Sequence, residues 1–148
     1  MSNCLAISPD GLAFGKNVTA YGGNGDDHFN ACISGYSNDT MTGGNGADTF
    51  AFAFRVTSAP TPAQPLISDF RGDLGDHVDL SRIDAFAGAP DDAFVWRGSQ
   101  AFDGAGQVRV TQQGGVTYLE TNLTGADTSE ARIAFTGSLT LLESCFTL

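Results

Sequence analysis

The feature that most constrains this 148-residue chain is a nine-residue pattern, present twice in full and once in a degenerate form. The pattern is G-G-x-G-x-D-x-U-x, where U is a large apolar residue. Residues 22–30 and 43–51 match it at every fixed position, and residues 34–42 match it in part, with Ser34 and Ser37 in place of glycine. A repeat this short cannot bury a core of its own, so the pattern predicts a coil of stacked turns.

Each repeat is expected to contain a loop of six residues followed by a short strand of three. Glycine tolerates positive φ, which lets the loop turn its carbonyl oxygens inward, and the aspartate at position six adds a carboxylate. Calcium takes roughly six to eight oxygen ligands of these two kinds. The apolar residue at position eight (Phe29, Met41 or Phe50) is expected to point into a thin core between two sheets. Because that core is small, ion binding would contribute directly to folding.

Loops that are two half-turns apart should stack on the same side of the coil. Asp27 and Asp48 are therefore predicted to share an ion, whereas Asp39 belongs to a loop on the opposite side. Before that loop come three additional residues, 31–33, which must bulge out or lengthen a strand. A flexible linker is the alternative interpretation, but a linker has no need of Phe or Met at each eighth position. The predicted loop ligands are Gly22, Gly23, Asn24, Gly25, Asp27, Asp39, Gly43, Gly44, Asn45, Gly46 and Asp48.

The charge of the chain bears on its partners. The net charge of −10 argues against nucleic acid and anionic membranes. No Lys or Arg lies between Lys16 and Arg55, so the carboxylates of the repeats have no basic partners nearby in the sequence. No segment approaches the length of a membrane span, so membrane insertion is not expected, and the N-terminus does not read as a secretory signal peptide.

The rest of the chain suggests a division within one cooperative domain: a lead-in at residues 1–21, the repeats at 22–56 and a cap at 57–148. Two predicted strands, 65–70 and 77–80, flank a Gly/Asp turn. Like charges this close repel each other, so water or a cation must screen them. The turn therefore predicts a second calcium site, with a solvated acidic hairpin as the alternative. Its predicted ligands are Asp69, Asp76 and Asp79.

The cap is expected to be almost entirely strands. Residues 81–86 predict one short helix with Ser81 as its N-cap. Gly114 and Gly115 predict a hairpin turn. Antiparallel strands are predicted at residues 93–98, 107–112, 116–122 and 131–136. The three cysteines, Cys4, Cys32 and Cys145, show neither zinc spacing nor a disulfide framework.

The order of these features resembles the C-terminal calcium-binding β-roll (RTX) domain of serralysin-type metalloproteases and related exported proteins. The resemblance implies an all-β fold: a right-handed parallel β-roll continued by an antiparallel β-sandwich-like cap, with one short helix at most. It also implies secretion to the cell exterior by type I secretion machinery, which needs no N-terminal signal peptide. Beyond the repeats, the matching segments are GADTFAF at 46–52, ISDF at 67–70, GDHVDLS at 75–81, the stretch from Phe94 to Arg109, GGVTYLE at 114–120 and IAFTGSLT at 133–140.

The expected function is a non-catalytic module that binds about two to four calcium ions and folds on reaching calcium outside the cell. No H-E-x-x-H occurs, and His28 and His77 are the only histidines, so the zinc site of the protease is absent and an enzymatic role is not expected. Two alternatives stay open. The chain could be part of a larger secreted metalloprotease or epimerase with an N-terminal catalytic domain. It could also bind an extracellular polysaccharide or surface through Trp96, Arg97, Arg109, Tyr118 and Arg132.

Overall fold

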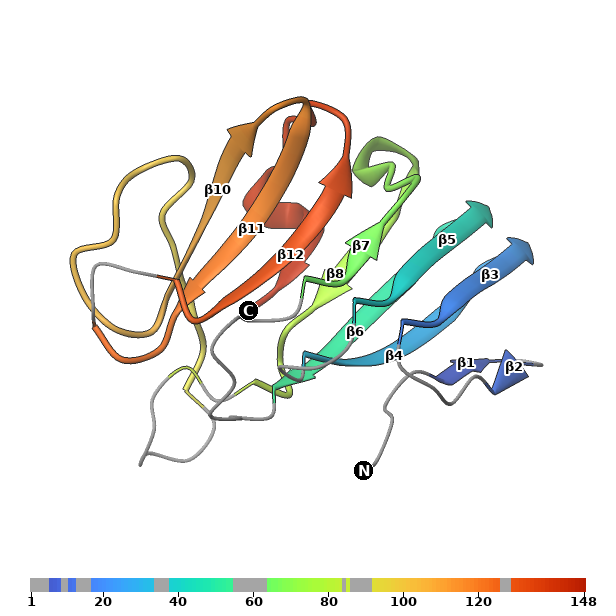
Figure 1. Ribbon diagram of the computed structural model, residues 1–148, viewed down its shortest axis with the longest axis horizontal. Coiled ribbons are helices and arrows are strands. Elements are labelled where there is room, and N and C mark those ends of the chain that lie inside the picture. The colour runs from blue at the N-terminus through green and yellow to red at the C-terminus, as the bar shows by residue number, and fades with distance from the viewer. Residues whose placement is uncertain are drawn as a thin grey trace.

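The computed structural model describes residues 6–8, 11–12, 17–33, 38–54, 64–83, 85, 92–125 and 129–148. These residues form two sheets of mixed strand direction, one with six strands and one with seven (Figure 1). The expected all-β class is confirmed. The described segments contain two 3-10 helices, η1 (Gly72–Leu74) and η2 (Glu143–Cys145), so the expectation of one short helix at most is exceeded by one turn.

Strands on either side of each repeat loop enter different sheets, and each sheet collects every second strand in parallel. The seven-stranded sheet contains the parallel neighbours β3 (Thr19–Asn24), β5 (Thr40–Asn45) and β7 (Leu66–Ile67). The six-stranded sheet contains the parallel neighbours β4 (His28–Ile33), β6 (Thr49–Phe54) and β8 (His77–Asp79). Parallel stacking therefore continues past the predicted boundary at residues 56 and 57, because β7 and β8 add a third turn.

The extra residues 31–33 lengthen a strand rather than bulge out. β4 runs from His28 to Ile33 and pairs with β6 along its whole length. The loops are shorter than the sequence predicts, since Gly22–Asn24 belongs to β3 and Gly43–Asn45 to β5. These residues extend because the paired backbones of β3 and β5 continue through them in register.

The cap continues the seven-stranded sheet and does not form a separate sandwich. Its strands are β9 (Val95–Trp96), β10 (Gln107–Gln113), β11 (Val116–Asn122) and β12 (Ala131–Thr136). β12 pairs in parallel with β7, which joins the cap to the repeats. Gly114 and Gly115 turn the β10–β11 hairpin with φ of 60° and 77°, as predicted. β9 was expected to be antiparallel but pairs in parallel with β10.

The first and the last strands of the described residues join the six-stranded sheet. β1 (Ala6–Ser8) and β2 (Gly11–Leu12) pair beyond β4, and β13 (Phe146–Thr147) pairs in parallel with β8. The helix predicted from Ser81 is wrong over residues 81–83, which form a turn and a bend. Asp79 accepts a hydrogen bond from the Ser81 backbone N–H at 2.9 Å, and this side-chain turn competes with a helical start.

A row of four phenylalanines joins the repeats to the cap. Phe29 and Phe50 stack with ring centroids 4.9 Å apart, as their position in the repeat predicts. Phe50 contacts Phe70 at 6.2 Å, and Phe70 meets Phe135 of β12 edge-on at 5.2 Å. All four side chains are buried. One core therefore connects the stacked turns to the cap.

Candidate metal centre

Three acidic loops stack on one side of the parallel strands. We call them the first tier (residues 22–27), the second tier (43–48) and the third tier (69–76), and together the acidic column. Asp48 Oδ1 accepts a hydrogen bond from the Asp27 backbone N–H at 2.9 Å. Asp76 Oδ1 accepts one from the Asp48 N–H at 3.0 Å. Asp48 and Asp76 therefore each bind the preceding tier through one carboxylate oxygen.

One carboxylate oxygen of Asp27 and one of Asp48 have no hydrogen-bond partner. Asp27 is 7% exposed and Asp48 is fully buried. The Oδ2 atoms of both are buried without a hydrogen-bond partner. Buried polar atoms are nearly always paired, and an unpaired buried charge is costly. The first two tiers thus hold negative oxygens that the protein itself does not satisfy.

A space beside Gly22 brings oxygens of two tiers together. A Cβ atom built on Gly22 would lie 2.3 Å from Asp27 Oδ2 and 2.5 Å from the carbonyl oxygen of Gly43. Both oxygens therefore border the same small space, which only a glycine leaves open. We call this space the Gly22 cradle. A carboxylate and a backbone carbonyl are the ligand types that calcium prefers.

The glycines of the second tier allow close approach to the first. A Cβ on Gly44 would lie 2.1 Å from the Gly23 carbonyl oxygen, and one on Gly46 would lie 2.2 Å from that of Gly25. Gly44 and Gly46 also have φ of 102° and 135°, which disfavours other residues. Backbone conformation and the close spacing of the tiers thus both require glycine at positions 44 and 46.

The electrostatics of the column favour a cation. Burial raises the pKa of Asp48 above its ordinary value, and the hydrogen bond from the Asp27 backbone only partly opposes this. The negative charges of Asp76, Asp27 and Asp69 raise it further. Three neighbouring carboxylates therefore raise the pKa of Asp48, and a bound cation would relieve that repulsion.

The third tier is satisfied differently. Asp69 accepts hydrogen bonds from the backbone N–H groups of Gly43 and Gly44, both at 2.9 Å, one on each oxygen. Asp76 Oδ2 accepts one from the Arg71 N–H at 2.7 Å, in addition to its Oδ1 bond with the second tier. Both carboxylates thus bind backbone with both oxygens.

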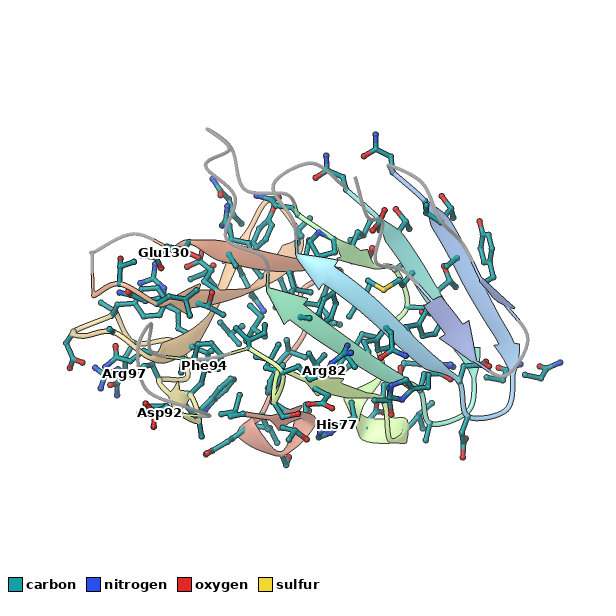
Figure 2. All side chains as sticks on the ribbon, turned by 90° about the horizontal axis from the view of Figure 1, so that it is seen from below. His77, Arg82, Asp92, Phe94, Arg97 and Glu130 are labelled. Atoms are coloured by element: carbon teal, nitrogen blue, oxygen red, sulfur yellow. The ribbon has the colours of Figure 1, made fainter. Side chains whose placement is uncertain are left out.

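Asp79, the third predicted ligand of this turn, faces other groups. Burial alone would raise the pKa of Asp79, but hydrogen bonds from Ser81 and the charges of Arg82 and His77 hold it below its usual value. Figure 2 shows Arg82 and His77 on the same side of the molecule. Asp69 and Asp76 thus lie with the acidic column, whereas Asp79 lies with a turn and basic side chains. Calcium at Asp69, Asp76 and Asp79 stays a prediction.

The opposite side of the strands carries a second ladder of side chains. Asp39 is 3% exposed, and its Oδ1 accepts a hydrogen bond from the Val18 N–H at 2.9 Å. Asn17 and Asn38 accept similar bonds from the next loop, namely from the backbone N–H groups of Asn38 and Gln64. Residues 34–37, which precede Asp39 in its loop, lie outside the described residues, so a site at Asp39 stays a prediction.

In the described segments, no three His, Cys, Asp or Glu side chains gather into a metal-binding group. An ion in the acidic column would therefore depend mainly on backbone carbonyls, as the glycine-rich loops lead one to expect. The two histidines lie elsewhere: His28 is exposed, and His77 Nε2 lies 2.7 Å from Thr147 Oγ1.

The aromatic and basic residues of the cap are engaged with one another. Glu120, which the sequence did not single out, pairs with Arg109 and Arg132 at 2.8 Å each. The two guanidinium groups also lie over the rings of Phe102 and Tyr118, at 4.4 and 4.1 Å. Register explains the cluster, because Glu120 lies opposite Arg109 on β10 and opposite Arg132 on β12.

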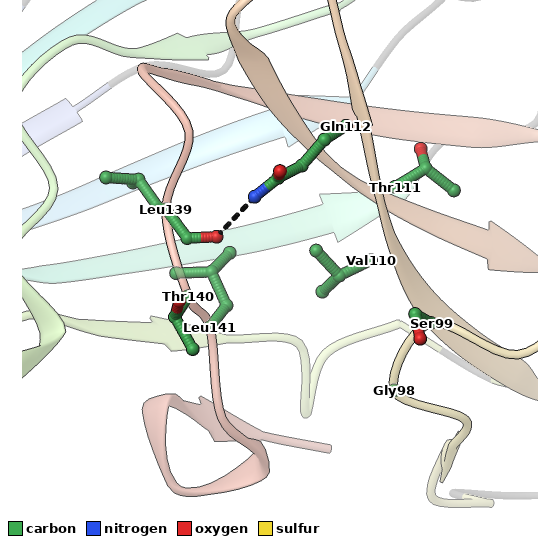
Figure 3. Close-up of a pocket in the computed structure, with 8 residues that line it drawn as sticks. All are labelled: Gly98, Ser99, Val110, Thr111, Gln112, Leu139, Thr140 and Leu141. Carbon is green, nitrogen blue, oxygen red and sulfur yellow. Dashed lines mark hydrogen bonds between the residues drawn. The ribbon is translucent and has the colours of Figure 1, made fainter.

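A groove of about 550 Å³ lies between β10 and the chain segment before η2 (Figure 3). Gln112 spans it and donates a hydrogen bond to the Leu139 carbonyl at 2.8 Å. None of its lining residues carries a charge. They are Gly98, Ser99, Val110, Thr111, Gln112, Leu139, Thr140 and Leu141.

Comparison of the chain with models of known protein families and with curated proteins finds no match. No helix in the described part of the chain has the length and apolar character needed to cross a membrane.

Proposed function

We propose that the chain is a non-catalytic calcium-binding module in which strands β3 to β8 form a parallel β-roll that folds around the ion. The observation that carries the proposal is the pair of buried, unpartnered Oδ2 atoms of Asp27 and Asp48. The Gly22 cradle adds a carbonyl from the second tier to the carboxylate of the first. Oxygens of these two kinds, without nitrogen or sulfur, suit a hard cation such as calcium.

Calcium would supply the positive charge that the acidic column lacks. Asp27 and Asp48 would hold the ion, with carbonyls of the first two tiers completing the shell. Because the loops are far apart in the unfolded chain, the ion would bind only the folded form and stabilise it. A site filled at about a hundred times its Kd contributes roughly 2.7 kcal/mol, which is a large part of the stability of a small domain.

This linkage suits a protein that is exported before it folds. Low calcium inside the cell would leave the stacked strands only weakly stable, and calcium outside would stabilise the folded form. Type I secretion, an extracellular location and an upstream catalytic domain are proposals that rest on the resemblance to the serralysin-type domain. The calcium proposal does not depend on them.

Binding of an extracellular polysaccharide is the second candidate, and the groove of Figure 3 is the observation that favours it. Hydroxyl and amide side chains such as Ser99, Thr140 and Gln112 can hydrogen-bond a sugar. The groove has no aromatic ring among its lining residues. Of the candidate arginines, Arg109 and Arg132 are paired with Glu120, and Arg97 is paired with Asp103. Calcium binding is therefore the better-supported function.

The test is far-UV circular dichroism of the metal-free chain during titration with CaCl₂, with MgCl₂ as the control. A cooperative gain of β signal with calcium alone is the expected result. A metal-free chain that is already folded, and that calcium does not stabilise against urea, would overturn the proposal. In that case, titration with anionic and neutral oligosaccharides would be the next experiment.

A further inference from the structure

The two interfaces of the acidic column are not equivalent. Between the first and second tiers, the space beside Gly22 is bordered by Asp27 and by the Gly43 carbonyl of the next tier. Gly43 is the corresponding residue one tier further on. The three atoms nearest to a Cβ on Gly43 all belong to Asp48, and its Oδ2 lies at 2.1 Å. No third-tier carbonyl takes the place that the Gly43 carbonyl has at the first interface.

A cationic side chain contacts the second interface instead. The Arg71 guanidinium donates a hydrogen bond through NH2 to the Gly44 carbonyl oxygen. Gly44 is paired in register with Gly23, and the Gly23 carbonyl oxygen lies against Gly44 of the second tier. The Gly44 carbonyl oxygen is contacted by Arg71 of the third tier. Arg71 therefore binds a carbonyl equivalent to one that an ion could use at the first interface.

The turn of the third tier holds Arg71 in this position. The Arg71 carbonyl accepts hydrogen bonds from the N–H groups of Leu74 and Asp76, at 2.9 and 3.2 Å. The Arg71 N–H in turn donates to Asp76 Oδ2 at 2.7 Å. Gly75 closes the turn with φ of 105° and packs against Ala47 of the second tier. The backbone on both sides of the side chain is thus fixed to the column.

We propose that Arg71 is a built-in cation that replaces a calcium ion between the second and third tiers, so that this side of the roll takes an ion only between the first and second. The inference rests on the proposed calcium function. It also accounts for the third-tier carboxylates, Asp69 and Asp76, whose oxygens bind backbone N–H groups rather than an unfilled space. Arg71 acts here as a determinant of how many ions bind, and not as a ligand.

The experiment is a count of bound calcium per chain, by isothermal titration calorimetry and by equilibrium dialysis with ⁴⁵Ca²⁺. Arg71→Met is compared with the wild type and with Arg97→Met, which removes the same charge. Arg97 pairs with the exposed Asp103 and lies at the end of the molecule away from β3 and β5 (Figure 2). Arg71→Met is expected to bind one more calcium than either. Arg71→Lys, which keeps a cation, is expected to bind as many as the wild type.

The outcomes separate the two proposals. If the wild type binds no calcium, the proposed function fails and this inference fails with it. If the wild type binds calcium and folded Arg71→Met binds the same number, this inference alone is overturned. Should Arg71→Met not fold, a crystal structure of the wild type grown with calcium decides: an ion bonded to the Gly44 carbonyl overturns the inference, and Arg71 on that carbonyl beside an occupied first interface supports it.

Discussion

Asp48 Oδ1 accepts a hydrogen bond from the backbone N–H of Asp27 at 2.9 Å, while Oδ2 of the same carboxylate is buried without a partner. The two oxygens of this carboxylate thus have different roles. One oxygen joins neighbouring tiers in the folded chain, and the other would gain a partner in the proposed calcium-bound state. This division predicts that a mutation can remove the charge of Asp48 and keep its hydrogen bond to the first tier.

Asp48→Asn should have opposite effects in the two states. The amide oxygen can still accept the bond from Asp27, but the charge that repels Asp27, Asp69 and Asp76 is gone. We expect calcium affinity to fall about 10- to 100-fold, since a bond to a charged group contributes roughly 1.5–3 kcal/mol. The metal-free chain should become more stable to urea. Calorimetry and urea unfolding with and without EDTA measure the two effects.

The control for this variant is Asp26→Asn. Asp26 is exposed, and its Oδ1 accepts a hydrogen bond from the Ala47 N–H at 2.8 Å, so it also joins the tiers. Asp26→Asn should leave calcium affinity within about twofold of the wild type. Equal losses of affinity in the two variants would mean that diffuse charge, and not the Asp48 carboxylate, holds the ion.

The pH dependence of the metal-free chain follows from the same residue. Burial, together with the charges of Asp76, Asp27 and Asp69, raises the pKa of Asp48 above its unfolded value of 3.8. A carboxyl with a raised folded pKa contributes stability below 3.8 and loses that contribution as pH rises through the folded pKa. The Tm of the wild type should therefore fall relative to that of Asp48→Asn as the pH rises above 3.8 in EDTA.

The difference in Tm between the wild type and Asp48→Asn does not contain the contribution of Asp79, because that residue is present in both proteins. The pKa of Asp79 is lowered in the folded chain, so Asp79 contributes stability that is present above pH 3.8 and is lost as the pH falls through the folded pKa. This contribution is the same in the wild type and in Asp48→Asn. With calcium present the trend should reverse, because protons compete with the ion for Asp48. A Tm difference that stays constant as the pH rises above 3.8 would show that folding of the metal-free chain does not raise the pKa of Asp48.

The sequence predicted the parts of the molecule that repeat. Glycine and aspartate spacing placed Asp27 beside Asp48, and the apolar eighth positions placed Phe29 on Phe50, because both relationships follow from one period. The third tier was not predicted as part of the stack, since residues 65–79 depart from the repeat and their strands lie in different sheets. Their stacking depends on long-range backbone pairing that no local pattern encodes.

Side chains that act across such pairing were missed for the same reason. The role of Glu120 requires the register of β10, β11 and β12, and that of Arg71 requires the third tier to lie on the second. The parallel direction of β9 is likewise set by its partner and not by its own two residues.

Gly22→Ala should abolish ion binding at the first interface. The new methyl group would lie 2.3 Å from Asp27 Oδ2 and 2.5 Å from the Gly43 carbonyl, and the backbone carbonyl cannot move aside easily. Gly22 does not have positive φ, so the substitution adds no backbone strain. We expect the calcium count to fall by one and the calcium-dependent rise in Tm to shrink, as measured by calorimetry and thermal unfolding.

Gly23→Ala is the matched control. Gly23 has φ of 109°, and a Cβ there meets no atom within 4 Å, so alanine strains the backbone by about 1 kcal/mol without filling the cradle. It should lower stability with and without calcium while keeping the ion count. If Gly22→Ala keeps the wild-type ion count, the ion does not lie beside Gly22.

Glu120→Gln should weaken the cap without affecting the proposed calcium site. Glu120 is nearly buried and pairs with Arg109 and Arg132, whose side chains are 23% and 26% exposed. The substitution leaves both guanidinium groups without their carboxylate. Because they are partly hydrated, we expect a loss of about 1–3 kcal/mol, below the cost of breaking a fully buried pair. Urea unfolding in saturating calcium measures it.

Asp103→Asn is the control for the cap, since Asp103 pairs with Arg97 on the surface and its loss should change stability little. Calcium affinity should be unchanged in both variants while the fold is intact, because Glu120 lies on β11, two strands beyond β7 in the same sheet. A marked loss of calcium affinity in Glu120→Gln would show that the phenylalanine row from Phe29 to Phe135 couples the cap to the acidic column. Unfolding of the two parts would then have to be treated as a single transition in every variant above.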